Sequence, residues 1–128
     1  MRLVSRIGMV VLLATVCGCG KEQPTLSGGK PVGHWVRTLQ DPIPKMRKQA
    51  AFKLGNVGTS DPVALPALIG ALKDRDAGVR REAVLALVKF GPAAREATPA
   101  LIEVRQRDPD AVARTYAAKT LAKLQGEK

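Results

Sequence analysis

Aromatic residues are scarce in this sequence. They make up 3% of its 128 residues, whereas hydrophobic residues of all kinds make up 45%. A core made from such residues depends mainly on Ala, Leu and Val, and this composition favours helices over a β-sandwich. Once both ends are set aside, about a hundred residues remain, which is enough for one domain.

Cysteine, histidine and serine are also rare. Cys17 and Cys19 are the two cysteines, so the rest of the chain has no internal disulfide and no thiol for metal or redox chemistry. The single histidine, His34, has no second imidazole to share a metal and no obvious nucleophile to activate. The three serines are Ser5, Ser27 and Ser60. With no visible pair of nucleophile and base, we predict that the protein is not an enzyme and holds no cofactor or metal.

Residues 1–18 have the composition of a secretory signal. A short basic start, with Arg2 and Arg6, leads into an uninterrupted apolar run over residues 7–16. That run is too short to cross a hydrocarbon core about 30 Å thick, but it matches the hydrophobic region of a signal peptide. We therefore predict export from the cytoplasm.

The apolar run ends in VCGCG, residues 16–20, which resembles the bacterial lipoprotein box. Val16 and Gly18 stand three residues and one residue before Cys19, as in that motif. The resemblance implies that Cys19 is acylated and anchors the protein to a bacterial membrane, facing the periplasm or the cell surface. Cys17 is the alternative site, although Val16 would then occupy the cleavage position, and an ordinary cleaved signal remains open.

Residues 19–30 are predicted to be the lipid anchor and a flexible linker, because they are rich in Gly and Pro and lack an apolar period. Ser27-Gly28-Gly29-Lys30 resembles a phosphate-binding loop only superficially, since the remaining positions of that motif are missing. The folded domain is predicted to span residues 31–128.

Within the predicted domain, two sets of positions recur in three copies, the first at an offset of 33 residues and the second at offsets of 33 and then 34. The first set is Val32, Trp35, Val36, Leu39; Leu65, Leu68, Ile69, Leu72; and Thr98, Leu101, Ile102, Arg105. The second set is Met46, Ala50, Leu54, Val57; Val79, Ala83, Leu87, Phe90; and Ala113, Ala117, Leu121, Leu124. Both sets have helical spacing. We therefore predict an all-α fold, a short α-solenoid (α-α superhelix) of about three helix pairs.

Turn residues agree with this repeat. Gly58 and Gly91 follow the second helix of their copies, where a left-handed cap is expected, and Gly126 stands near the equivalent end of the third. Asp76 and Asp110 occupy N-cap positions of the second helices. We assign Asp74 and Asp108, two residues earlier, to the same caps.

The central copy carries the pattern DxDxxVRxxAxxALxxFG over residues 74–91, and the third copy carries DPDxxARxxA over residues 108–117. These patterns resemble the short bacterial HEAT repeats, a group that includes the repeats of phycobilin lyase proteins. The resemblance spans about three quarters of the chain and implies the solenoid fold, whereas fold alone does not imply an activity.

Arg47, Arg80 and Arg114 take equivalent places in the three copies and should align as a ladder. The resemblance implies that each arginine binds an aspartate of a neighbouring turn. The available aspartates are Asp41, Asp74 or Asp76, and Asp108 or Asp110. A second interpretation is that the ladder, with Lys48 and Arg81 beside it, forms a basic stripe for an anionic partner. The Asp-x-Asp pairs also suggest a divalent cation, but capping and the arginine ladder explain them more simply.

The chain has 21 Lys and Arg against 11 Asp and Glu, a formal net charge of +10, which favours anionic partners. We predict a non-catalytic, membrane-tethered scaffold of the cell envelope that binds a protein partner of acidic character. Two alternatives stay open. One is binding of nucleic acid or another anionic polymer, which export disfavours; the other is a relative of the chromophore lyases, for which few aromatic side chains could line a pocket. The aromatic residues are Trp35, Phe52, Phe90 and Tyr116.

Overall fold

The computed structural model describes residues 25–126, so the predicted signal segment, Cys17 and Cys19 lie outside the described residues, as do residues 127–128. Six α-helices follow one another along the described range. They are α1 (Val32–Thr38), α2 (Pro44–Val57), α3 (Ala64–Ala71), α4 (Ala77–Val88), α5 (Thr98–Arg107) and α6 (Ala111–Gln125). Two short 3-10 helices, η1 (Gly58–Ser60) and η2 (Gly91–Ala97), join consecutive pairs.

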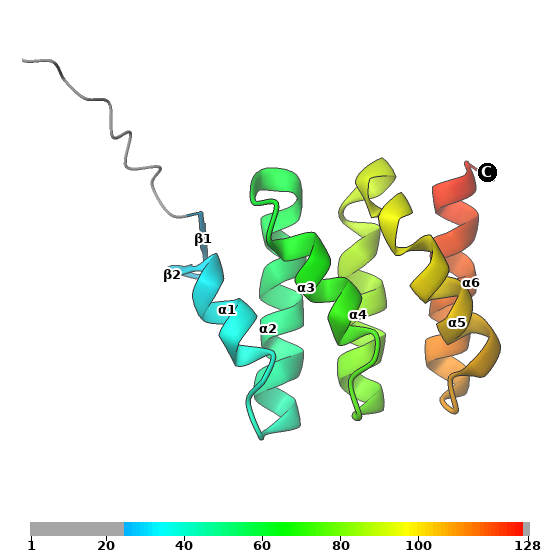
Figure 1. The fold of residues 1–128 in the computed structure, drawn as a ribbon, viewed down its shortest axis with the longest axis horizontal. Coiled ribbons are helices and arrows are strands. Elements are labelled where there is room, and N and C mark those ends of the chain that lie inside the picture. Colours follow the sequence, from blue (N-terminus) through cyan, green and yellow to red (C-terminus); the bar gives the residue numbers. More distant parts are fainter. Residues whose placement is uncertain (1–24, 127–128) are drawn as a thin grey trace, which may run out of the picture.

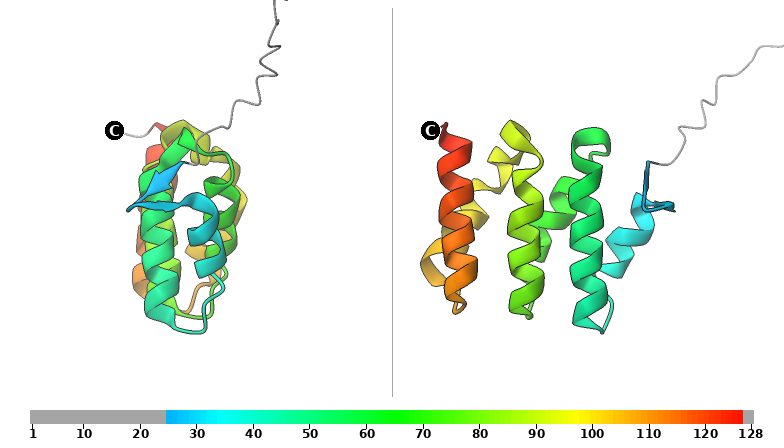
Figure 2. Two further views of the ribbon diagram at one scale, coloured as in Figure 1. Left: turned by 90° about the vertical axis from the view of Figure 1, so that its left-hand side faces the viewer. Right: turned by 180° about the vertical axis from the view of Figure 1, so that it is seen from behind.

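The helices form two layers (Figure 1). Helices α2, α4 and α6 stand side by side as one row, the B layer, and the row is seen from behind in Figure 2. Helices α1, α3 and α5 cross in front of it as the A layer. The prediction of a short all-α solenoid of three helix pairs is confirmed. None of the helices in residues 25–126 combines the length and hydropathy needed to cross a membrane.

The core lies between the two layers and consists of aliphatic residues from the repeated positions. Leu54, Leu68, Leu87 and Leu101, one from each of α2 to α5, are fully buried. Arg105 departs from the pattern: it is exposed, whereas its equivalents in the first two copies are buried leucines, and Val104 is buried instead. The predicted helical register therefore holds, with an irregular end to α5.

Neighbouring helices of the B layer approach closely at small residues. A Cβ placed on Gly55 of α2 would lie 2.7 Å from the Cβ of Ala86 on α4. Ala51, one turn before Gly55, has no exposed surface. This close approach sets the spacing of the row, and the sequence analysis did not single out Gly55.

The predicted helix ends are confirmed at Asp76, Asp110 and Gly126, but the left-handed caps expected at Gly58 and Gly91 are wrong. Gly58 has φ 56° and ψ −140°, outside the left-handed helical region, and α4 ends with Lys89 as its C-cap, so that Gly91 begins η2 instead. The side chain of Asp76 accepts a hydrogen bond from the Val79 amide at 3.1 Å, and Asp110 accepts one from the Ala113 amide at 2.7 Å. Gly126 ends α6 in the left-handed conformation, with φ 77° and ψ 17°.

The predicted flexible linker is wrong for its last residues, because residues 26–31 form an antiparallel hairpin of β1 (Leu26–Ser27) and β2 (Lys30–Pro31). Gly28 and Gly29 at its tip both have positive φ, 58° and 76°, as a tight two-residue hairpin turn requires. Trp35 of α1 donates a buried hydrogen bond from Nε1 to the Ser27 carbonyl at 2.8 Å. The ordered domain therefore begins before residue 31.

Candidate functional site

Two arginines of the predicted ladder each bind an aspartate of the following repeat. Arg47 donates from Nε and Nη2 to the carboxylate of Asp74, at 2.9 and 3.1 Å. Arg80 does the same to Asp108, at 2.7 and 3.0 Å. We call each of these paired contacts a rung. Both rungs have the two-point geometry that makes arginine–carboxylate pairs strong and directional.

The remaining nitrogen of each ladder arginine binds the backbone of its own turn. Nη1 of Arg47 donates to the carbonyl of Asp41 at 2.8 Å, and Nη1 of Arg80 donates to that of Asp74 at 2.8 Å. Nη1 of Arg114 donates to the carbonyl of Asp108 at 2.7 Å. All three guanidinium groups are thus tied to the turn that precedes their helix.

The rungs are buried between repeats. In the rung of Arg47 and Asp74 the side chains are 4% and 11% exposed, and in that of Arg80 and Asp108 they are 11% and 4% exposed. Burial by itself raises the pKa of Asp74 and of Asp108, but hydrogen bonds from the arginine and a backbone amide outweigh it and hold both pKa values below the ordinary range. These carboxylates stay ionised, and the ladder serves to join repeats.

Arg81, predicted to belong to a basic stripe, is also paired. Its Nε and Nη2 bind the carboxylate of Asp110 at 2.7 and 2.6 Å. The hydrogen bond from Arg81 lowers the pKa of Asp110 to about 2, against a small effect of burial. Lys48, the equivalent of Arg81 in α2, is exposed. The stripe of unpaired cations that the second interpretation requires is therefore absent at Arg47, Arg80 and Arg81.

Asp74 and Asp108 do not cap helices, so their assignment as caps is wrong. Each instead accepts a hydrogen bond from the amide two residues later, that of Asp76 at 2.9 Å and that of Asp110 at 2.8 Å. This local turn aims the carboxylate at the arginine of the preceding repeat. Within residues 25–126 no group of three or more His, Cys, Asp or Glu residues is placed to hold a metal ion.

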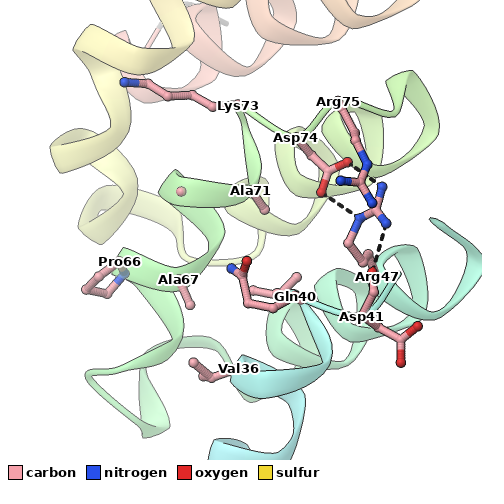
Figure 3. A pocket seen from close by; sticks show the side chains of 12 residues that line it. Val36, Gln40, Asp41, Arg47, Pro66, Ala67, Ala71, Lys73, Asp74 and Arg75 are labelled. Carbon is pink, nitrogen blue, oxygen red and sulfur yellow. Dashed lines mark hydrogen bonds and ion pairs between the residues drawn. The ribbon is translucent and has the colours of Figure 1, made fainter. Parts of the chain in front are cut away.

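A hollow of about 490 Å³ lies between α1 and α3, beside the first rung (Figure 3). Val36, Gln40 and Ala67 line it, and the pair of Arg47 and Asp74 stands at one end. Lys73 extends away from the rung. The lining combines small and aliphatic side chains with polar and charged ones, namely Gln40, Asp41, Lys73 and Arg75 besides the rung.

The outward surface of the B layer carries exposed apolar side chains among lysines. Phe52 of α2 and Leu85 of α4 occupy the same position of successive repeats, and they are 44% and 42% exposed. Lys89 connects the two helices, because its Nζ lies 4.6 Å from the centre of the Phe52 ring and 2.6 Å from the Asn56 side-chain oxygen.

The same surface continues onto α6. Leu85 and Lys89 line a hollow of about 410 Å³ together with residues of α6. We call this surface the B face; its residues are Phe52, Leu85, Lys89, Tyr116, Lys119 and Lys123. The sequence analysis missed the B face, although the offset of 33 residues between Phe52 and Leu85 was a usable signal.

His34 does not contribute to a site. Its ring lies 4.8 Å from that of Trp35, in an edge-to-face arrangement at 80°. It therefore packs on its neighbour Trp35 in the first repeat, at the hairpin end of the array.

Comparison with known protein families adds one finding. Residues 34–122 match the family model described as HEAT repeats, which covers more than half of the chain. The matched range runs from α1 into α6 and includes both rungs. A search of curated proteins gave no match.

Proposed function

Since the chain belongs to the family of HEAT repeats, which commonly mediate protein–protein interaction, we propose that it is an envelope scaffold that binds a protein partner. The proposed scaffold is held at a bacterial membrane by an acylated Cys19, and its partner binds the B face. HEAT repeats generally serve as scaffolds without catalytic activity.

The exposed apolar pair Phe52 and Leu85 is the observation that carries this proposal. Large apolar side chains at the centre of a surface, with polar groups around them, are typical of protein-binding patches. Lys89 lies over the Phe52 ring and lines the hollow beside Leu85, together with Lys119 and Lys123. None of these lysines is in a salt bridge within the described part of the chain. A partner with apolar side chains and carboxylates fits this chemistry best.

The sequence supports the anchor. The basic start, the apolar run over residues 7–16 and the placement of Val16 and Gly18 before Cys19 together match a lipoprotein signal. A lipid at this point, followed by a few residues before β1, would hold the repeats close to the bilayer.

Cross-linking in the native host tests the B face. We expect a defined envelope protein to co-purify with the wild-type chain, and Phe52→Ala combined with Leu85→Ala to reduce its recovery at least about tenfold, the effect of losing roughly 1.4 kcal/mol of binding. The matched control is Ile43→Ala with Val63→Ala, which removes two apolar side chains that are somewhat more exposed but lie outside the B face. Equal recovery with both double variants would refute the proposal, provided that circular dichroism shows both to be folded.

Ionic strength separates this proposal from nucleic-acid binding. Phosphate contacts release counterions, so binding to DNA falls steeply between about 50 and 200 mM salt. Because Arg47, Arg80 and Arg81 are already paired with aspartates, we expect weak binding to DNA even at low salt. Tight, steeply salt-dependent binding of a mixed-sequence duplex would favour the nucleic-acid function instead.

A further inference from the structure

Arg114 makes the same backbone contact as the other ladder arginines, but among residues 25–126 it has no aspartate that pairs with its side chain. Its Nη1 is fixed on the Asp108 carbonyl at 2.7 Å, as Arg47 and Arg80 are fixed on their own turns. The Nε and Nη2 edge, which takes a carboxylate in the other two repeats, meets none within residues 25–126. The backbone therefore orients a guanidinium edge that is ready for a carboxylate.

The surface beside Arg114 has the small residues that let B-layer helices stack. Ala118 of α6 takes the place of Ala51 and Val84, which are fully buried against the next helix, but Ala118 itself is partly exposed. Ala122 takes the place of Gly55, where α2 approaches α4 most closely, and is also partly exposed. A helix can therefore approach this side of α6.

Arg105 adds a second cation at the same end. Its equivalents, Leu39 and Leu72, line the hollows beside Arg47 and Arg80 respectively. By the same repeat geometry, we expect exposed Arg105 to lie near Arg114, although the turn between them is one residue longer than in the second copy. We call the surface of Arg105, Arg114, Ala118 and Ala122 the α6 end face.

The opposite end of the array does not offer the matching surface. Lys53 of α2 occupies the place of Ala86 and Thr120, both buried against the preceding helix, and the Ser27 hydroxyl binds the Lys53 carbonyl at 2.8 Å. Seen from that end, the hairpin lies across α2 (Figure 2). Asp41 at this end could pair with Arg114 of a second copy. However, the hairpin and Lys53 obstruct the stacking of that copy's α6 on α2.

We propose that the α6 end face is a second docking surface, which binds a pair of helices of another protein through an aspartate in the turn between them. The chain itself shows which occupant fits, because Asp74 and Asp108 reach Arg47 and Arg80 from turns of this kind. The aspartate completes a third rung on Arg114, beside Arg105, and the helix that follows it packs on Ala118 and Ala122. This surface is distinct from the B face.

An extended chain tests whether the end face accepts such a helix pair. A copy of residues 92–126 is appended after Gly126, so that the aspartate equivalent to Asp108 can reach Arg114. Arg114→Gln is expected to lower the melting temperature of the extended chain by at least about 5 °C, but that of the natural chain by less than about 2 °C. Replacing the appended aspartate by asparagine should have the same effect, and both changes together should add little.

Two results of this experiment would overturn the proposal. One is an extended chain with no more helix than the natural chain, because the face then does not accept a helix pair. The other is an equal effect of Arg114→Gln in both chains, because Arg114 then acts only on its own turn.

The natural partner is tested with a photo-reactive side chain at position 118 of the full chain in its native host. The expected adduct maps to an aspartate-bearing turn between two helices of the partner, falls about tenfold with Arg114→Gln, and is unchanged by Phe52→Ala on the B face. Cross-linking to a second copy of this chain, an adduct insensitive to Arg114→Gln, or no adduct would each contradict the assignment.

Discussion

Gly55 lies at a close approach of α2 and α4, since a Cβ at this position would lie 2.7 Å from that of Ala86 and 3.0 Å from its Cα. Alanine is normally better than glycine inside a helix by about 1 kcal/mol. Here the added methyl group would force two helices apart, at a cost of about 1–3 kcal/mol. We expect Gly55→Ala to lower the free energy of unfolding by up to about 2 kcal/mol, measured by urea denaturation.

Gly70 of α3 is the matched control for Gly55. A Cβ at this position would meet no atom within 4 Å. Gly70→Ala should therefore raise the free energy of unfolding by about 0.4–1 kcal/mol, because it restricts the unfolded chain without a clash. If both substitutions shift stability in the same direction, the close approach of α2 and α4 is not as described.

Asp108 shows what a rung contributes. Asp108→Ala leaves the buried Arg80 without its carboxylate and is expected to cost about 3–5 kcal/mol of unfolding free energy. Asp61→Ala is the control, since Asp61 accepts the same kind of local hydrogen bond, from the Val63 amide at 2.9 Å, but pairs with no arginine among residues 25–126. It should cost about 0.5–1.5 kcal/mol. Similar losses for the two variants would mean that the rung contributes nothing beyond its turn.

Among the elements, the hairpin is held to the helices by hydrogen bonds at Ser27, whose hydroxyl binds the Lys53 carbonyl and whose carbonyl accepts from Trp35. Trp35 is 4% exposed and donates its indole hydrogen bond to the Ser27 carbonyl at 2.8 Å. Trp35→Phe leaves that buried acceptor unpaired, so we expect a loss of about 1–3 kcal/mol in chemical denaturation. Tyr116→Phe, which removes a hydroxyl without a described hydrogen bond, should change stability by less than about 0.5 kcal/mol. Equal effects would show that the hairpin is not held by this bond.

The helices could be predicted from the sequence, whereas the hairpin could not. Periodic apolar positions such as Leu54 and Leu87 mark the buried side of each helix, and Asp76 marks a helix start. The hairpin is two residues long on each side, too short for an alternating pattern. Gly28 and Gly29 were the available signal, since adjacent glycines suit a tight turn, but a flexible linker has the same composition.

The rungs could be predicted from the sequence, whereas the B face could not. The pairing of Arg47 and Arg80 with aspartates follows from repeat spacing, because stacked copies bring equivalent positions together. The B face depends on which side of each helix faces solvent once the layers have packed. Phe52 looks like a core residue in the sequence, and only the packing of α2 leaves it exposed.

At the scale of the whole molecule, the rungs make stability depend on pH. The pKa values of Asp74, Asp108 and Asp110 are lowered in the folded state, and that of Asp110 is about 2. Their stabilisation is thus fully present above the unfolded value of about 3.9 and is lost as the pH falls through the lower folded values. We expect melting temperatures to be level between about pH 7 and 5 and to fall below about pH 4. A variant with Asp108→Asn should fall less steeply, and a flat profile for the natural chain would contradict the rungs.

We propose that this repeat array is a membrane-tethered scaffold of the envelope, and its anchor is the part to measure first. Mass spectrometry of the N-terminal peptide, from protein purified from the native host, should show acyl chains on Cys19, and Cys19→Ala should abolish them. A chain that keeps Met1, carries no acyl group and resides in the cytosol would contradict the claim. The basic helices would then point to nucleic acid as the better partner.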